Sequence, residues 1–150
     1  WRIPAERAKT AKPHAVPLSG LALGLLVQLR ALSGDSDFLV PTAHKKAKAG
    51  ENASERLLSR AVRNNEDHFG IPHFTPHDLR RSAASGMTRL GVPRLHVEKV
   101  LGHAIADVAE IYDRHDYAAE KRTALDKWSA HLQGILSGKS ASVTRLKVRA

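Results

Sequence analysis

The segment from Thr75 to Gly91 constrains the fold most strongly, because it carries signals for both ends of an amphipathic helix. Thr75 is suited to cap the helix, Pro76 fits its first position, and Asp78 follows the cap at capping-box spacing. Gly91 is a typical C-terminal stop. The apolar positions recur at helical spacing and are predicted to face a core: Leu79, Ala83, Gly86 and Leu90.

The rest of the chain predicts a mainly helical α+β fold with a small N-terminal β-hairpin. Residues 1–3 and 14–18 are the expected hairpin strands, and 38–41 is expected to be a short buried strand or an extended segment. Further helices are expected over residues 21–32 (capped by Ser19), 53–67, 94–101 and 107–112, and from about 116 onward. Their inward-facing positions are expected to include Leu57, Ala61 and Leu58 in the second of these, and Leu125, Trp128, Leu132 and Ile135 in the last.

Composition narrows the functional classes. The chain has 150 residues, 42% of them hydrophobic, which suits one domain with a real core. The absence of cysteine excludes a disulfide scaffold, a thiolate nucleophile and a Cys-ligated zinc site. No apolar run reaches the roughly 18 residues of a membrane span, so a soluble, intracellular protein is expected.

The net charge of +9 favours a polyanionic partner, either nucleic acid or an anionic membrane surface. Part of this charge lies at the end of the chain, where four basic residues occur with no acid: Lys139, Arg145, Lys147 and Arg149. We therefore expect a folded domain over 1–138. Residues 139–150 are expected to form a basic tail, either disordered or foreign to the natural protein.

Three local groups can carry chemistry. His77 and Arg80 share one face near the N-terminus of the Thr75 helix, an end that favours anions. His103 follows Leu101-Gly102, with Tyr112 nine residues later, while Lys9 and Lys12 lie on the hairpin turn.

Such groups suit metal-free phosphoryl transfer. A tyrosine hydroxyl, whose pKa is about 10, needs a base and stabilised phosphate oxygens in order to attack phosphorus. Arginine binds phosphate with paired donors, histidine donates or exchanges a proton, and lysine can protonate a leaving alkoxide. Together they favour a covalent tyrosine ester as the intermediate.

The order of these motifs resembles the catalytic-domain signature of the tyrosine recombinases, the phage integrase family. The resemblance covers residues 1 to about 136, and the run from Ile111 and the opening of the chain are similar to integrases of satellite phages and genomic islands. It rests on His77-Asp78-Leu79-Arg80-Arg81-Ser82, Leu101-Gly102-His103 and Ile111-Tyr112-Asp113-Arg114-His115-Asp116-Tyr117, together with the opening Trp1-Arg2-Ile3-Pro4-Ala5-Glu6-Arg7 and the run His14 to Ser19. Each motif alone is weak, but all of them in order, with the His-to-Tyr spacing kept, form a specific signal.

The resemblance implies a role for each residue. Tyr112 would attack a DNA phosphate, forming a 3′-phosphotyrosyl link and freeing a 5′-hydroxyl. Arg80 and His103 would bind the non-bridging oxygens. His77 would assist proton movement, and Lys9 would be the general acid. No metal or nucleotide cofactor would be needed.

The resemblance also implies the setting of the reaction. The full enzyme would integrate or excise a mobile element at double-stranded DNA attachment sites, as a homotetramer in the bacterial cytoplasm, at the nucleoid and without a membrane. The family's catalytic set includes another arginine before the hairpin, which no residue here can fill. With Met87 as the only methionine and Trp1 as the first residue, we expect an N-terminally truncated catalytic domain that binds DNA weakly and cleaves it poorly on its own.

Several alternatives stay open at this stage. Tyr117 is the rival nucleophile and Lys12 the rival general acid, and the basic side chains of Lys12, Arg81, Lys45 and Lys46 are possible DNA contacts. His68, His73 and His77 are a weak candidate for a metal site, because Pro72 and Pro76 interrupt their alignment. The last helix could dock on a neighbouring protomer instead of forming core. A non-catalytic DNA-binding module is the second functional candidate, and a metal-dependent nuclease the third.

Overall fold

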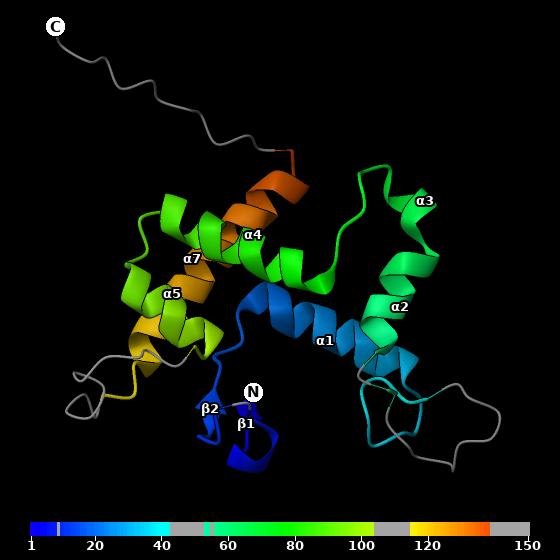
Figure 1. The fold of residues 1–150 in the computed structure, drawn as a ribbon, viewed down its shortest axis with the longest axis horizontal. Helices are drawn as coiled ribbons and strands as arrows, with labels where there is room; N and C mark the ends of the chain where they lie inside the picture. Colours follow the sequence, from blue (N-terminus) through cyan, green and yellow to red (C-terminus); the bar gives the residue numbers. More distant parts are fainter. Residues whose placement is uncertain (9, 43–52, 55, 104–114, 139–150) are drawn as a thin grey trace, which may run out of the picture.

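A short antiparallel hairpin opens the chain, as the sequence predicts (Figure 1). The computed structural model describes residues 1–8, 10–42, 53–54, 56–103 and 115–138. Strand β1 (Arg2–Ile3) pairs with β2 (His14–Ala15), so that Arg2 lies opposite Ala15 and Ile3 opposite His14. A 3-10 turn, η1 (Ala5–Arg7), occupies part of the connection. A sheet this short is not stable alone, so its position in the fold depends on contacts with the helices beside it.

Helices make up the rest of the described structure. They are α1 (Gly20–Leu32), α2 (Leu57–Asn64), α3 (Glu66–Phe69), α4 (Pro76–Arg89), α5 (Arg94–Leu101) and α7 (Ala118–Leu136). Helices α4, α5 and α7 contact one another, and α1 contacts α7, whereas α2 and α3 stand to one side of this group (Figure 1). Among the described helices, none combines the length and the apolar character that crossing a membrane would require.

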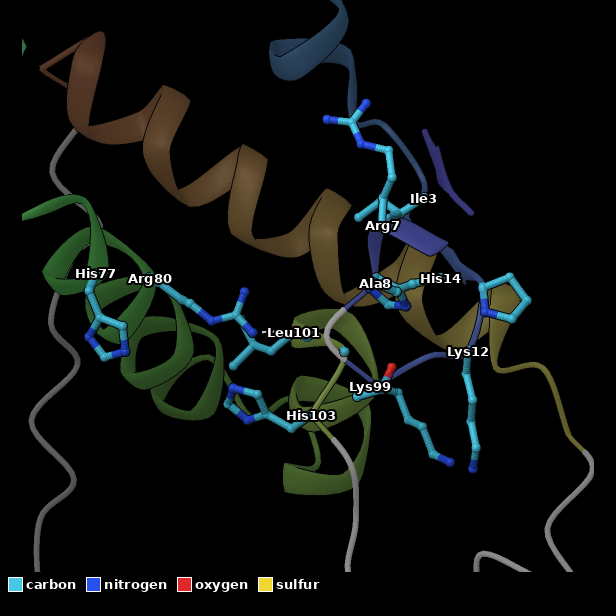
Figure 2. A pocket seen from close by; sticks show the side chains of 13 residues that line it. Ile3, Arg7, Ala8, Lys12, His14, His77, Arg80, Lys99, Leu101 and His103 are labelled. Atoms are coloured by element: carbon cyan, nitrogen blue, oxygen red, sulfur yellow. Dashed lines mark hydrogen bonds between the residues drawn. The ribbon is translucent and has the colours of Figure 1, made fainter. Parts of the chain in front are cut away.

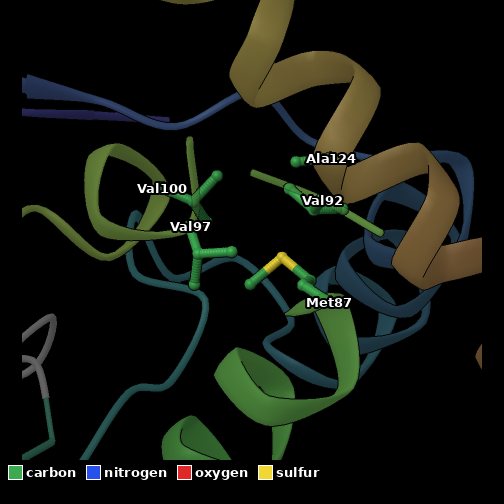
Figure 3. Packing of buried hydrophobic residues seen from close by; sticks show 5 residues of the cluster. All are labelled: Met87, Val92, Val97, Val100 and Ala124. Atoms are coloured by element: carbon green, nitrogen blue, oxygen red, sulfur yellow. The ribbon is translucent and has the colours of Figure 1, made fainter. Parts of the chain in front are cut away.

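The core lies where α4, α5 and α7 meet. Its buried side chains are Met87, Val92, Val97, Val100 and Ala124 (Figure 3). The half-buried Leu125 and Trp128 of α7 pack against this cluster, as their spacing predicts. At Gly86 of α4, an added Cβ would lie 2.2 Å from the Trp128 ring, so glycine is what allows the two helices to approach.

The start of α4 is the best determined local feature. The Thr75 side chain accepts a hydrogen bond from the backbone N–H of Asp78, and the Asp78 carboxylate accepts one from the backbone N–H of Thr75, which completes the predicted capping box. The Thr75 hydroxyl also donates to this carboxylate at 2.7 Å. These hydrogen bonds, with a smaller effect of Arg81 and His77, hold the pKa of Asp78 below its usual value of 3.8. The capping box therefore fixes the residue at which α4 begins.

The inward faces of two helices differ from the prediction. On α4, Leu79 is 54% exposed, and Met87 is buried beside the predicted Gly86, because α5 and α7 pack onto the C-terminal half of the helix. The predicted helix over 53–67 is two helices, broken at Asn65. Its expected inward residues Leu57, Leu58 and Ala61 are exposed, and its neighbour Val62 is the buried one.

Two smaller expectations also differ from the structure. Of the two alternatives for 38–41, the buried strand does not form: residues 38–40 are exposed bends, and the half-buried Pro41 makes an isolated β-bridge. Ile135, on the predicted apolar stripe of the last helix, is 60% exposed because it lies beyond the part of α7 that packs on the core. The predicted helix over 107–112 and the tail over 139–150 lie outside the described residues.

Candidate functional site

A pocket of about 980 Å³ lies between the hairpin, the first turns of α4 and the end of α5. Figure 2 shows side chains from these three parts of the chain around the pocket, with the Arg7 guanidinium pointing away from the others. The chemistry-bearing lining residues are Arg7, Lys12, His14, His77, Arg80, Lys99 and His103. Tertiary structure thus brings together groups up to 96 positions apart in the sequence, from Arg7 to His103.

Helix α4 supplies His77 and Arg80. Both belong to its first turns, directly after the capping box, and their spacing puts them on one face as predicted. The Arg80 guanidinium donates a hydrogen bond to the backbone carbonyl of Leu101 at the end of α5 (Figure 2). Because a guanidinium has several N–H donors, this bond orients Arg80 and leaves donors for an anion.

The end of α5 supplies His103. Gly102 has a left-handed conformation with φ of +65°, which ends the helix and turns the chain back toward it. The backbone N–H of His103 then donates to the carbonyl of Glu98 at 3.2 Å, and its Nδ1 lies 2.5 Å from the Glu98 carboxylate. His103 is therefore held at both its backbone and its ring, with the ring at the pocket wall.

The hairpin is joined to the helices at the floor of the pocket. The His14 ring makes a hydrogen bond from Nε2 to the carbonyl of Val100 at 3.1 Å. An added Cβ on Gly102 would lie 3.1 Å from this ring, so a larger residue would displace it. On the far side of the strand, buried Lys121 of α7 donates from Nζ to the carbonyl of Ala15 at 3.0 Å. These contacts place the hairpin loop against α5.

The pocket is electropositive. Arg7, Lys12, Arg80 and Lys99 line it, and no described lining residue is acidic. Figure 2 shows the Lys12 and Lys99 side chains extending in the same direction, one from the hairpin loop and the other from α5. Several cationic side chains around one pocket raise the local concentration of anions and suit the binding of a phosphate.

Lys99 is a site residue that the sequence does not reveal. It lies four positions before His103 in a helix whose other residues look structural, and only the fold shows that it lines the pocket. Its Nζ lies 4.7 Å from the centroid of the Tyr117 ring, a cation–π contact. One signal in the sequence could have suggested Lys99: it is a lysine near the end of a helix that leads into the Leu-Gly-His motif.

The structure places some predicted site residues and not others. His77, Arg80, His103 and Lys12 line the pocket, whereas Arg81 does not and lies 3.6 Å from the Asp78 carboxylate. The rival tyrosine, Tyr117, does not line the pocket either, and its ring packs on those of His115 and His96. The remaining candidates lie outside the described residues: Lys9, Lys45, Lys46 and Tyr112.

The weak histidine candidate for a metal site has a different arrangement. The His73 ring lies 2.5 Å from the Glu66 carboxylate, and His77 faces the pocket. Among the described residues, no three His, Asp or Glu side chains are grouped so that they could hold a metal ion.

Comparisons with known proteins identify the family of this chain. The model of the phage integrase family matches residues 1–119. Prophage integrase IntA of Escherichia coli K12 is 28% identical over 150 residues, which cover 99% of this chain and 35% of the relative. Tyrosine recombinase XerA of Thermococcus onnurineus is 29% identical, covering 71% of this chain and 37% of the relative. The integrase of enterobacteria phage P4 is 37% identical over 75 residues, covering 42% and 16%.

The chain spans about a third of the length of the first two relatives. No solved structure matches it significantly. The family match covers both the hairpin and the helices that build the pocket, and its relatives are integrases and tyrosine recombinases. Because the family model matches most of its length, the chain belongs to the phage integrase family.

Proposed function

We propose that this chain is the catalytic part of a site-specific DNA recombinase that cuts and rejoins strands through a 3′-phosphotyrosyl intermediate. The observation that carries the proposal is the pocket in which Arg80, His77 and His103 lie beside Lys12 and Lys99. A DNA phosphodiester is the polyanion whose size and charge fit it. The family match supports a DNA substrate.

In the proposed reaction, the Tyr112 hydroxyl oxygen forms a bond to phosphorus and the bond from phosphorus to the 5′-oxygen breaks. The phenolic proton leaves with assistance from His77, and the departing 5′-oxygen takes a proton from Lys9, or from Lys12 as the alternative. Arg80 and His103 donate hydrogen bonds to the non-bridging oxygens, where negative charge grows in the transition state. Religation runs these steps in reverse, so the ester conserves the bond energy.

The whole enzyme is proposed to act on double-stranded attachment sites as a homotetramer in the bacterial cytoplasm, integrating or excising a mobile element. This chain lacks a residue for the family's other catalytic arginine. Losing one charge-stabilising donor of this kind costs about 10²–10³-fold in rate. The chain by itself is therefore expected to bind DNA weakly and to cleave it poorly.

A nicked suicide substrate, whose cut end diffuses away, tests the proposal by trapping the covalent adduct. A longer recombinase that contains this chain should give a stoichiometric adduct, which Tyr112→Phe abolishes and Tyr117→Phe leaves intact. Chelator should have no effect on the adduct. The chain alone should give little adduct, and a stoichiometric one would overturn the proposed deficiency.

Each alternative predicts a different result in the same assay. If no adduct depends on Tyr112 although the protein binds DNA, the chain is a DNA-binding module. If chelator abolishes cleavage and no adduct forms, it is a metal-dependent nuclease. Either result would overturn the phosphotyrosyl mechanism.

A further inference from the structure

Glu98 faces His103 across the turn that ends α5, although it does not line the pocket itself. The two residues are five positions apart, a spacing that does not bring side chains together on a helix. They meet because Gly102 adopts the left-handed conformation and folds His103 back over the last turn. The contact is therefore a product of the turn that the Leu-Gly-His motif forms.

The carboxylate determines which ring nitrogen carries the proton. An ionised Glu98 only accepts hydrogen bonds, and its Oε2 lies 2.5 Å from Nδ1 of His103, so Nδ1 is the protonated nitrogen. Nε2 is then the atom available to the pocket. A doubly protonated ring, in which both nitrogens are donors, can donate from Nε2 to a phosphate oxygen while Nδ1 still donates to Glu98.

We infer that Glu98 is a positioning residue of the active site, which accepts a hydrogen bond from Nδ1 of His103 and so keeps a proton on Nδ1 and directs Nε2 toward the pocket. The inference rests on the proposed function of the pocket. Partners of this kind orient functional histidines in metal sites, where their loss costs about 10–100-fold. Glu98 is well placed for the role because its side chain is only 28% exposed.

A rival reading makes Glu98 a surface ion-pair partner of Arg94 on the same helix. The Arg94 Nε lies 3.7 Å from Oε1 of Glu98, but its side chain is 89% exposed. An exposed pair of this kind contributes little to the stability of a helix and would place no proton on His103. The two readings therefore differ in what happens to the His103 ring when Glu98 is replaced.

The first test reads the proton directly by ¹⁵N NMR on this chain with labelled histidine, His103 being assigned from the signal lost in His103→Gln. We expect the Nδ1–H form in the unaltered chain, a shift toward the Nε2–H form in Glu98→Ala, and its return in Glu98→Gln, whose amide oxygen still accepts from Nδ1. Glu66→Gln is the matched control, because Glu66 contacts His73 Nδ1 at the same 2.5 Å away from the pocket. An unchanged His103 tautomer in Glu98→Ala would overturn the inference.

The second test measures the rate of adduct formation on the suicide substrate by the longer recombinase. His103→Gln should lose about 10²–10³-fold. Glu98→Ala should lose about 10–100-fold and Glu98→Gln less. Adding Glu98→Ala to His103→Gln should cost nothing more, because the two act as a unit.

The outcomes separate the two proposals. Full activity in Glu98→Ala, or losses that multiply in the double variant, would overturn the role of Glu98 while the proposed function stands. Full activity in His103→Gln would contradict the proposed function of the pocket itself, whatever the NMR shows.

Discussion

At the scale of single residues, two glycines decide how closely the parts of this molecule approach. Gly86 lets α4 lie against Trp128 of α7. Gly102 permits the left-handed turn that ends α5 and leaves room for the nearby His14 ring. One has ordinary helical backbone and is needed for space, whereas the other has a φ of +65° and is needed for conformation and space. Substitutions at the two positions should therefore fail for different reasons.

Gly86→Ala should destabilise the chain by about 1–3 kcal/mol, because its Cβ would overlap the Trp128 ring in a packed core. The free energy of unfolding in urea measures the loss. Gly24→Ala on α1 is the matched control: it has open space around the added Cβ and should gain about 0.5–1 kcal/mol from helix propensity. Equal stabilities for the two variants would contradict the close approach of α4 and α7.

Gly102→Ala should be more harmful than Gly91→Ala. Both positions have positive φ, at +65° and +76°, so each alanine should cost about 1–2 kcal/mol in backbone strain. Only at position 102 would the new Cβ also press on the His14 ring, at 3.1 Å, whereas position 91 is open. Urea unfolding measures the difference, and the His103 ring signals should move only in Gly102→Ala. A larger loss at position 91 would show that the hairpin does not lie against the α5 turn.

At the scale of elements, the capping box defines the start of α4 and so the positions of His77 and Arg80. This was predictable, because a threonine, a proline and an aspartate at these spacings satisfy backbone donors that have no partner inside the helix. The inward face of α4 was not predictable, because it depends on where α5 and α7 pack against the helix. Met87 and Leu79 show the consequence: one is buried and the other exposed, against the periodic pattern.

Thr75→Ala should destabilise the chain by about 1 kcal/mol, because the Asp78 N–H loses its acceptor and the Asp78 carboxylate loses the hydroxyl donor, keeping only the backbone N–H of residue 75. Thr75→Ser keeps the hydroxyl and should restore most of the stability. Chemical unfolding at neutral pH measures both. If Thr75→Ala is as stable as Thr75→Ser, the cap does not hold this end of α4.

The pH dependence of this cap follows from the lowered pKa of Asp78. A carboxylate whose pKa is lower in the folded chain adds stability that is complete above its ordinary pKa of 3.8 and is lost as the pH falls through the folded value. The difference in unfolding free energy between the unaltered chain and Asp78→Asn should therefore be constant from pH 5 to 8, and should shrink below about pH 3.8. A difference that grows in acid would contradict the direction of the shift.

At the scale of the whole molecule, the hairpin and the helices depend on each other. The sheet is too small to be stable alone, and it is held by His14 on Val100 and by Lys121 on Ala15. These contacts bring the basic hairpin loop to the pocket, where Lys12 joins Lys99 of α5. The positive charge of the pocket is thus brought together by tertiary structure from separate segments of the chain.

If Lys12 and Lys99 both contact DNA, the salt dependence of DNA binding should change when either side chain is replaced. Lys99→Gln and Lys12→Gln should each reduce the slope of log affinity against log salt by about 0.9, the value expected for one phosphate contact. Lys127→Gln, on an exposed part of α7 outside the pocket, is the control and should leave the slope unchanged. Fluorescence anisotropy of a labelled duplex measures all three. An equal change in the Lys127 variant would mean that the pocket is not the DNA-binding face.

The sequence by itself determined the helical character, the hairpin, the α4 cap and the family, because each depends on local backbone chemistry or on the order of motifs along the chain. It also singled out His77, Arg80 and His103 as candidates, and all three line the pocket. Only the tertiary structure decided which helix faces are buried, that Lys99 lines the pocket, and that Glu98 meets His103. These facts depend on packing between elements and on a left-handed turn that reverses the chain. Neither the packing between elements nor this turn can be predicted from the periodicity of the sequence.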